Sequence, residues 1–449
     1  MNRYFAALTP LLCLFAPWQL LGNDTVPPGA QSKPILIIGA TIHPVSSDPI
    51  PRGQLLLVGG KVEGVFAEES DFVIPDGTVT IELAEEKHIY PGMIAANSVL
   101  GLVEINAVRA TVDIAEPGAI NPNARAQISV NPDSELIPVT RANGVLATLT
   151  IPRGASGGLI GGQSALMRMD GWTWEEMTIK SPVGMHVFWP ELRQFPRWTS
   201  TVDEKELEKM RKAYGEAVEK LTEAFADTRA YVKAAEGETV DTDLRWEALA
   251  PVLAGELRLF IHAQTAGQIQ DALHFTAREK IASPVIVGGR DAWRLTSELA
   301  ARDAAVILSP VNDLPRRWEA YDTPYTAASK LHAAGIPFCI ANSGSAFDAA
   351  NERNLPYQAA RAAAHGLDPE TAFKSVTLFP AQILGVADRL GSLEDGREAT
   401  FFVTNGDPLE VRTTVERAWI RGREIDLSSR HTQLFEKYQE KYRQRQQAE

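Results

Sequence analysis

The chain has 449 residues, of which 45% are hydrophobic and 22% are charged. This length allows a large core together with a second, smaller domain, and the composition is that of a soluble globular protein. The net charge is −13, and the sequence holds no basic cluster before its C-terminal tail. These features exclude nucleic acid and an anionic membrane surface as the expected main partners.

Residues 1–23 differ in composition from the rest of the chain. Arg3 is their only charged residue, and a long apolar run follows it. A positive start, an apolar stretch and a small or polar end are typical of a signal peptide. The alternative is a membrane anchor, which Pro10 and Pro17 disfavour. We therefore expect an exported protein, periplasmic or secreted, with no membrane contact after the signal is cleaved.

Short strands separated by tight turns are predicted at both ends of the chain. The N-terminal part covers residues 34–90, and the pair Gly59-Gly60 turns one apolar run into the next. The C-terminal part covers residues 391–426. Each part is too small to form a domain alone, so we expect the two to combine in one small β-sandwich.

Between these parts, residues 91–390 alternate short apolar runs with segments of helical periodicity. Buried parallel strands that alternate with helices imply a β/α barrel or a doubly wound sheet. The number of units favours the barrel, so the predicted fold class is α/β, a TIM-like (β/α)8 barrel plus the small sandwich. Cys339, the one cysteine left after signal cleavage, lies in such a run. We expect it to fill core space, and no internal disulfide can form.

Two segments are predicted as long amphipathic or charged helices. Residues 202–235 begin with a capping-box pattern, after which apolar residues recur at helical spacing. We expect this helix to be inserted into the barrel region and to cover it or contact a partner. Residues 427–449 predict a charged helical tail, either solvated or lying on a neighbouring chain.

One sequence run marks the junction between the first β segment and the predicted barrel. It reads His-Ile-Tyr-Pro-Gly-Met-Ile-Ala-Ala-Asn-Ser-Val from His88 to Val99. Here the chain resembles the amidohydrolase superfamily, imidazolonepropionase-like branch, whose members carry Pro-Gly-(Leu/Met)-Ile-Asp-Ala-His-x-His at this point. The runs Ala-Ala-His-Gly-Leu, Thr-Leu-Phe-Pro-Ala-Gln-Ile-Leu-Gly-Val and Arg-Leu-Gly-Ser-Leu-Glu-Asp-Gly agree as well. The resemblance implies a metal-binding barrel, usually with zinc, that hydrolyses non-peptide carbon–nitrogen or cyclic amide bonds.

The resemblance also shows that most metal-ligand positions carry residues that bind metal poorly. Two histidines at i and i+2 of a strand point the same way, but these positions hold Asn97 and Val99. The strand-six histidine position holds Gly288, and the aspartate that acts as the family's general base is replaced by Asn342. His262 is the one retained ligand. We therefore expect the metal to be absent or weakly held, and Asn342 cannot act as a base.

Other residues are weaker candidates for function. The segment after the strand-eight position suggests substrate contacts from Asn351, Arg353 and Asn354. His186 is nearest in order to the unplaced strand-four ligand, and His262 could also be an ordinary core histidine. The glycine-rich residues 154–164 predict a mobile or tightly turning loop.

A Ser-His-Asp arrangement of Ser343 or Ser345 with His262 lacks a supporting nucleophile motif. Polar residues after the first barrel strand could line a pocket: Glu104, Arg109, Asp113 and Glu116.

Two functions remain open at this point. One is a hydrolase of carbon–nitrogen bonds whose metal is changed or absent. The other is a non-catalytic relative that binds a small molecule, or that pairs with an amidohydrolase paralogue or with copies of itself.

Overall fold

The structure is a computed structural model that describes residues 25–155, 157–192, 204–237 and 241–448. The predicted signal peptide lies outside the described residues. Within them, no helix is both long enough and apolar enough to cross a membrane.

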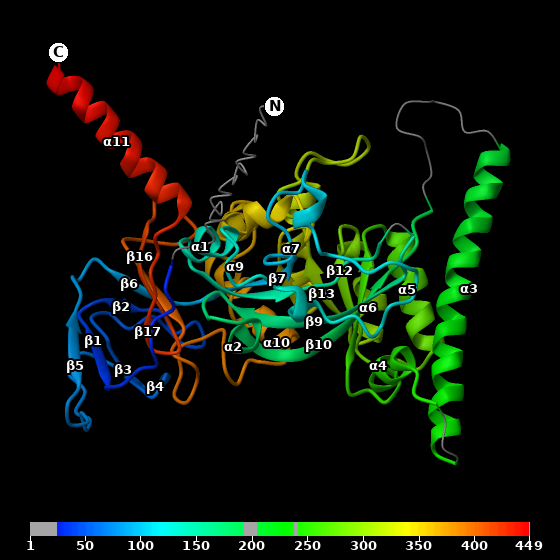
Figure 1. Cartoon of the computed structure of the whole chain (residues 1–449), viewed down its shortest axis with the longest axis horizontal. Coiled ribbons are helices and arrows are strands. Elements are labelled where there is room, and N and C mark those ends of the chain that lie inside the picture. The colour runs from blue at the N-terminus through cyan, green and yellow to red at the C-terminus, as the bar shows by residue number, and fades with distance from the viewer. Residues whose placement is uncertain (1–24, 156, 193–203, 238–240, 449) are drawn as a thin grey trace, which may run out of the picture.

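An eight-stranded sheet forms the centre of the molecule (Figure 1). Its strands are β7 (Met93–Ser98), β8 (Val145–Thr150), β9 (Ile160–Arg168), β10 (Thr178–Phe188), β11 (Arg258–Ala263), β12 (Val285–Gly288), β13 (Ala305–Leu308) and β14 (Phe338–Ile340). The strands neighbour one another in chain order, from β7 at one edge to β14 at the other. This nearly closed sheet confirms the predicted TIM-like barrel.

Two features depart from a regular barrel. Strand β9 runs antiparallel to both β8 and β10, whereas the other paired strands of this sheet are parallel. The two edge strands are bridged by an irregular segment: Ile340 N donates to Ser375 O at 3.0 Å, and Ile94 N donates to Val376 O at 2.8 Å. The segment therefore takes up edge groups of β14 and β7 that would otherwise be unpaired.

The glycine-rich segment is only partly a loop, because Ile160–Ser164 belong to β9. Gly162 has a φ of +126°, and a Cβ at this position would lie 2.4 Å from the Ala124 carbonyl oxygen. Glycine therefore permits the close approach of β9 to the chain that precedes it.

Helices cover the outside of the barrel and connect its strands. They are α1 (Leu136–Arg141), α2 (Trp174–Met177), α4 (Leu244–Leu253), α5 (Ala266–Arg278), α6 (Thr296–Ala301), α7 (Thr323–Ala333), α8 (Leu355–Ala363), α9 (Pro369–Lys374) and α10 (Leu378–Ile383). Short 3-10 turns are η1 (Arg109–Thr111), η2 (Ala126–Ser129), η3 (Ala292–Arg294) and η4 (Asp348–Asn354). Helix α5 begins with a capping box, in which Thr265 and Gln268 satisfy each other's backbone N–H groups.

A small β domain combines both ends of the chain, as predicted. One sheet has the order β4-β3-β1-β5 and the other β17-β16-β15-β6-β2. The strands are β1 (Ile35–Ile38), β2 (Thr41–Ile42), β3 (Gln54–Val58), β4 (Lys61–Phe66), β5 (Val79–Glu82), β6 (His88–Pro91), β15 (Phe401–Thr404), β16 (Val415–Ile420) and β17 (Arg423–Glu424). Apolar side chains of both sheets share one core, in which Phe401 stacks on Trp419 at 4.8 Å. The residues chosen as domain boundaries stay predictions.

Buried ion pairs connect this small domain to the barrel. Arg168 of β9 contacts Glu398 at 2.9 Å, and the two side chains are 6% and 10% exposed. Arg389 bonds to the same carboxylate. Removing one partner of such a pair leaves a buried charge unpaired, so the pairs hold the two domains in register.

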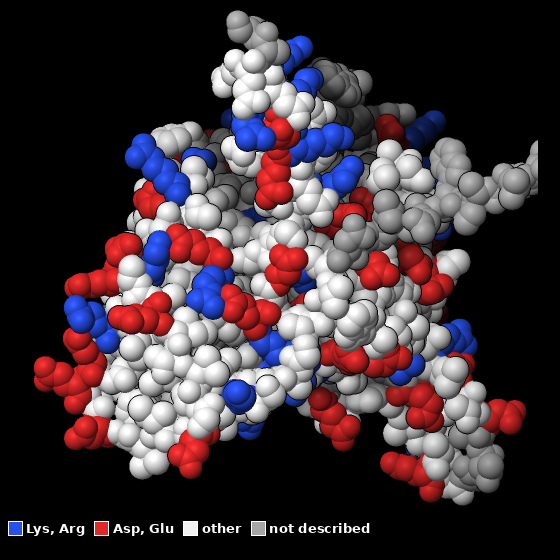
Figure 2. All heavy atoms as spheres, turned by 60° about the vertical axis from the view of Figure 1, so that its left-hand side comes forward, with Lys and Arg blue, Asp and Glu red and all other residues white. Residues whose placement is uncertain are grey.

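Two long helices lie outside the barrel. Helix α3 (Glu204–Ala235) runs along one side of the molecule, and α11 (Arg430–Ala448) projects from the opposite side (Figure 1). Helix α3 packs through a short buried stripe, in which Phe225 meets Phe275 of α5 edge to face at 5.3 Å. Figure 2 shows acidic and basic side chains intermixed on the face that carries the small domain and α11.

Candidate functional site

Asn97 and Asn342 meet inside the barrel, although they are far apart in the sequence. Asn97 is at the end of β7, and Asn342 follows β14. The Asn97 Nδ2 group donates to the Asn342 backbone oxygen at 2.9 Å and to Ser309 Oγ at 3.4 Å. The Ser309 hydroxyl donates to the same backbone oxygen. Both asparagines are almost fully buried, so the position expected to bind metal instead binds the backbone of the neighbouring strand end.

The Asn342 side chain is held at both ends. Its Nδ2 donates to Glu352 Oε2 at 2.9 Å, and its Oδ1 accepts from Gln358 Nε2 at 3.0 Å. Gln358 in turn accepts from the backbone N–H groups of Val311 and Asn312, at 2.9 and 2.7 Å. This chain of bonds fixes the amide orientation of Asn342, because each end meets a partner of opposite character.

Glu352 is a fully buried acid that the sequence interpretation missed. Burial raises its pKa to about 7, against the opposing effect of hydrogen bonds from Asn342 and Ser98. Its Oε1 atom has no hydrogen-bond partner among the described residues, and neither has Asn97 Oδ1. The signal that could have identified it is its place between Asn351 and Arg353, in a segment already selected for function.

His262 pairs with a second histidine. His186 Nδ1 and His262 Nε2 are 3.0 Å apart, on the neighbouring strands β10 and β11. Phe188 stacks on His262 at 4.1 Å, and the Arg153 guanidinium lies 5.3 Å from the centre of the Phe188 ring. Burial, and then the positive charge of Arg153, lower the pKa of His186 to about 3. Burial, His186 and Arg153 lower the pKa of His262 well below its usual value. Both rings are therefore neutral at neutral pH.

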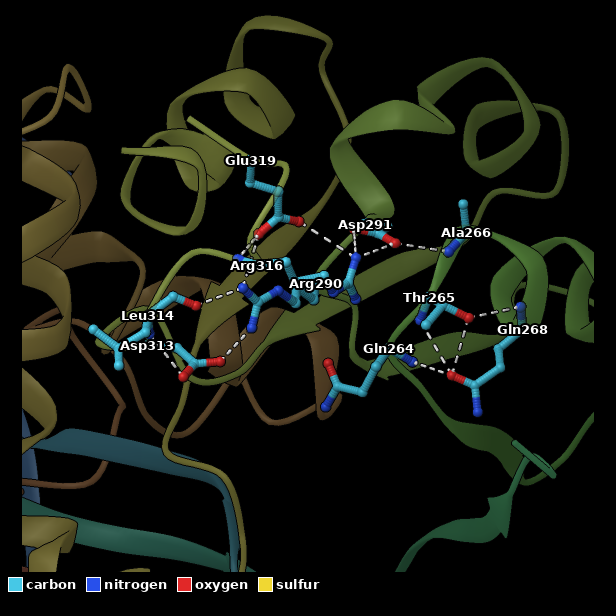
Figure 3. A network of polar contacts seen from close by, with 10 residues as sticks. All are labelled: Gln264, Thr265, Ala266, Gln268, Arg290, Asp291, Asp313, Leu314, Arg316 and Glu319. Atoms are coloured by element: carbon cyan, nitrogen blue, oxygen red, sulfur yellow. Dashed lines mark hydrogen bonds and ion pairs between the residues drawn. The ribbon is translucent and has the colours of Figure 1, made fainter. Parts of the chain in front are cut away.

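The space beside Gly288 is filled by Gln264. Gly288 ends β12 with a φ of +99°, and a Cβ there would lie 2.4 Å from Gln264 Nε2. Figure 3 shows the Gln264 side chain pointing away from its neighbours Thr265 and Gln268. Val99 is fully buried in the barrel core. A side chain at position 288 would therefore require Gln264 to move.

An ionic network holds the loops that follow β12 and β13 (Figure 3). Arg290 bonds to Asp313 and, at 2.9 Å, to Glu319, while Arg316 bonds to Asp291 at 2.9 Å. Asp291 also accepts from the backbone N–H of Ala266, the first residue of α5, at 3.0 Å. These charge-assisted bonds rigidify the loops on this side of the barrel.

The predicted substrate-binding residues face several directions. Arg353 bonds to His431 of α11 at 2.8 Å, and Asn351 bonds back to the Phe347 carbonyl oxygen at 3.4 Å. Asn354 stands at the start of α8 without a side-chain capping bond. The substrate role of Asn351, Arg353 and Asn354 stays a prediction.

The remaining polar candidates are likewise separate from His262. Ser343 bonds to Ser345 at 3.0 Å and to Asp348, whereas the bonded partner of His262 is His186. Asp113 and Glu116 line a cavity of about 30 Å³ near the start of β9.

The residues present do not fit the divalent metal that the family usually binds. Among the described residues, no three histidine, cysteine, aspartate or glutamate side chains are grouped as a metal site. Asn97 directs its N–H group to a carbonyl oxygen, and both oxygen and nitrogen of Asn342 are bonded. The nearby Arg153 charge also opposes a second cation beside the histidines.

Comparisons with known proteins agree on the lineage. A sequence model described as "Amidohydrolase family" matches residues 186–426, more than half of the chain. Amidohydrolase tasK of Hapsidospora irregularis is 24% identical over 442 residues, which cover 87% of this chain but 43% of that protein.

Solved structures give the same answer. An amidohydrolase from Thermotoga maritima MSB8 has a TM-score of 0.76 at 26% identity, covering 87% of this chain and 99% of its own. A zinc-bound adenosine deaminase from Xanthomonas campestris shares the fold at a TM-score of 0.51 and 15% identity, covering 92% and 98%. The chain belongs to the amidohydrolase family.

Proposed function

We propose that this chain is an exported member of the amidohydrolase family that has lost metal-dependent hydrolysis and acts as a binding protein or partner subunit. One observation carries the proposal. The ligand positions at the ends of β7, β12 and β14 are held in neutral hydrogen bonds or filled by a neighbouring side chain, Gln264.

The energetics of metal binding support this conclusion. A divalent cation must exchange its water for donors with free lone pairs, and each missing ligand reduces that compensation. Asn97 and Asn342 would have to break their mutual contacts before either could turn an oxygen to a cation. Loss of those buried bonds costs roughly 1–3 kcal/mol for each unsatisfied group.

The first experiment is elemental analysis of the purified protein. We expect well under one equivalent of zinc, iron or manganese, and a stoichiometric, tightly held metal would contradict the proposal. A second arm restores the family's ligands together: Asn97→His, Val99→His, Gly288→His and Asn342→Asp.

The structure sharpens this second arm. Gln264 occupies the space that a histidine at position 288 needs. We therefore expect zinc uptake to rise when Gln264→Ala is added to the four restorations, and the fourfold variant that keeps Gln264 is the matched control. Equal zinc uptake in both variants would show that Gln264 does not block the site.

A second candidate is a hydrolase with an altered centre. It is favoured by Glu352, a carboxyl with a pKa of about 7 beside the position of the family's base. Amide or lactam hydrolysis by the wild type that a chelator leaves intact and Glu352→Gln abolishes would establish it. Hydrolysis that a chelator abolishes would instead restore the metal enzyme.

A partner role is supported by the projecting helix α11. Phe435, Tyr438 and Tyr442 lie at helical spacing and are 63%, 48% and 58% exposed. Such a stripe on a solvent-exposed helix suits contact with another chain, either a copy of this one or an amidohydrolase paralogue. Light scattering of the full chain and of a variant ending at residue 429 tests self-association; an unchanged mass would exclude α11 from it.

A further inference from the structure

A cavity lies between the small domain and the barrel, away from the buried asparagines. Its volume is about 250 Å³. One wall comes from the segment after β2 and from Tyr90 of β6, and another from α9 through Glu370 and Phe373. The loop after β15 contributes Asp407. The cavity is therefore formed where the two domains meet, and each domain provides part of its lining.

Tyr90 provides a polar group without a partner. Its side chain is 7% exposed, its ring stacks on His43 at 4.1 Å, and it meets Phe373 edge to face at 5.1 Å. Among the described residues, none forms a hydrogen bond with its hydroxyl group. A tyrosine this deeply buried normally bonds its hydroxyl, so the open position next to the cavity suits a ligand atom.

The electrostatic character of the lining is acidic. Asp407 and Glu370 line the cavity, and none of its described lining residues is a lysine or arginine. Glu370 also pairs with Lys374, at 2.5 Å, whereas Asp407 forms no ion pair within the described part of the chain. Burial and the neighbouring His88 lower the pKa of His43 to about 4, so its imidazole brings no positive charge at neutral pH.

The backbone of the cavity wall is strained at one residue. Val45 has a φ of +76°, in the left-handed region that β-branched residues rarely adopt. Its side chain is buried against the barrel core and also lines the cavity. Strain of this kind persists only where surrounding contacts impose it, which indicates a built wall.

We propose that this cavity binds a small organic cation, an ammonium group attached to an aromatic or apolar body. The ammonium would donate to the Tyr90 hydroxyl and face Asp407, while the body packs between His43, Phe373 and the prolines of the rim. Aromatic faces and carboxylates together favour such a cation, and the same carboxylates disfavour an anion. This proposal does not depend on the loss of metal-dependent hydrolysis.

The test is calorimetric titration of the whole protein with 2-phenylethylamine. Phenylacetate and 2-phenylethanol serve as ligands of the same shape with negative and zero charge. We expect measurable binding of the amine, weaker binding at high salt, and no comparable binding of phenylacetate. Binding of phenylacetate as tight as that of the amine would overturn the proposal.

Two conservative variants locate the site. We expect Asp407→Asn to weaken amine binding about threefold, because an exposed ion pair is worth little. Tyr90→Phe should weaken it about fivefold, the value of one neutral hydrogen bond. Asp395→Asn, an exposed acid of the same domain outside the cavity, is the matched control. Unchanged affinity in both cavity variants, or an equal loss in the control, would refute the assignment.

Discussion

Glu352→Gln should make the protein more stable than the wild type at neutral pH, although it removes a buried acid. In the folded chain the Glu352 carboxyl has a pKa of about 7, raised from 4.5 mainly by burial. The protonated carboxyl and the glutamine amide each offer one acceptor oxygen and one donor group. The variant therefore imitates the protonated wild type at every pH.

The magnitude follows from linkage between protonation and folding. Because the folded-state pKa lies above the unfolded value, the stability contributed by protonation is fully present below pH 4.5. It is lost as the pH rises through about 7. The difference between the two pKa values corresponds to about 3 kcal/mol at the upper end of this window. We expect the two proteins to be similar near pH 4.5 and to diverge in favour of the variant up to pH 8.

Equilibrium urea denaturation between pH 4.5 and pH 8 measures this difference directly. The difference between the two curves isolates Glu352, because the other titrating groups are common to both proteins. Glu236→Gln, at an exposed position of the long outer helix, controls for the loss of one acid. A constant stability difference across the pH range would refute the reasoning. A divergence in favour of the wild type would show that the carboxylate, not the acid, is the stabilised form.

Two further predictions concern packing and the domain junction. Gly344→Ala should lower the unfolding free energy by roughly 1–3 kcal/mol more than Gly335→Ala, measured by urea denaturation. Both glycines have similar positive φ values, but only at Gly344 would a Cβ meet Asn97, at 2.7 Å; equal losses would mean that Asn97 moves aside freely. Glu398→Gln should cost about 3 kcal/mol in the same assay, because Arg168 would stay buried without its counter-charge. A cost below 1 kcal/mol would place this pair among ordinary surface ion pairs.

The fold could be predicted largely because its patterns are local. Alternating runs and turn residues identified the strands of the small domain, and their position at both chain ends identified the sandwich. The antiparallel course of β9 could not be predicted in this way. Its glycines permit either a loop or a close strand, and only contact with the preceding chain, at Ala124, selects the strand.

The sequence by itself determined that the positions of Asn97, Val99, Gly288 and Asn342 lack metal-binding side chains, because the chemistry of a side chain does not depend on the fold. Only the tertiary structure decided what takes the place of those ligands. Gln264 enters the space beside Gly288, and Glu352 and Gln358 hold Asn342. These partners lie on other elements, and a buried polar group bonds with whatever the packed chain brings within about 3 Å.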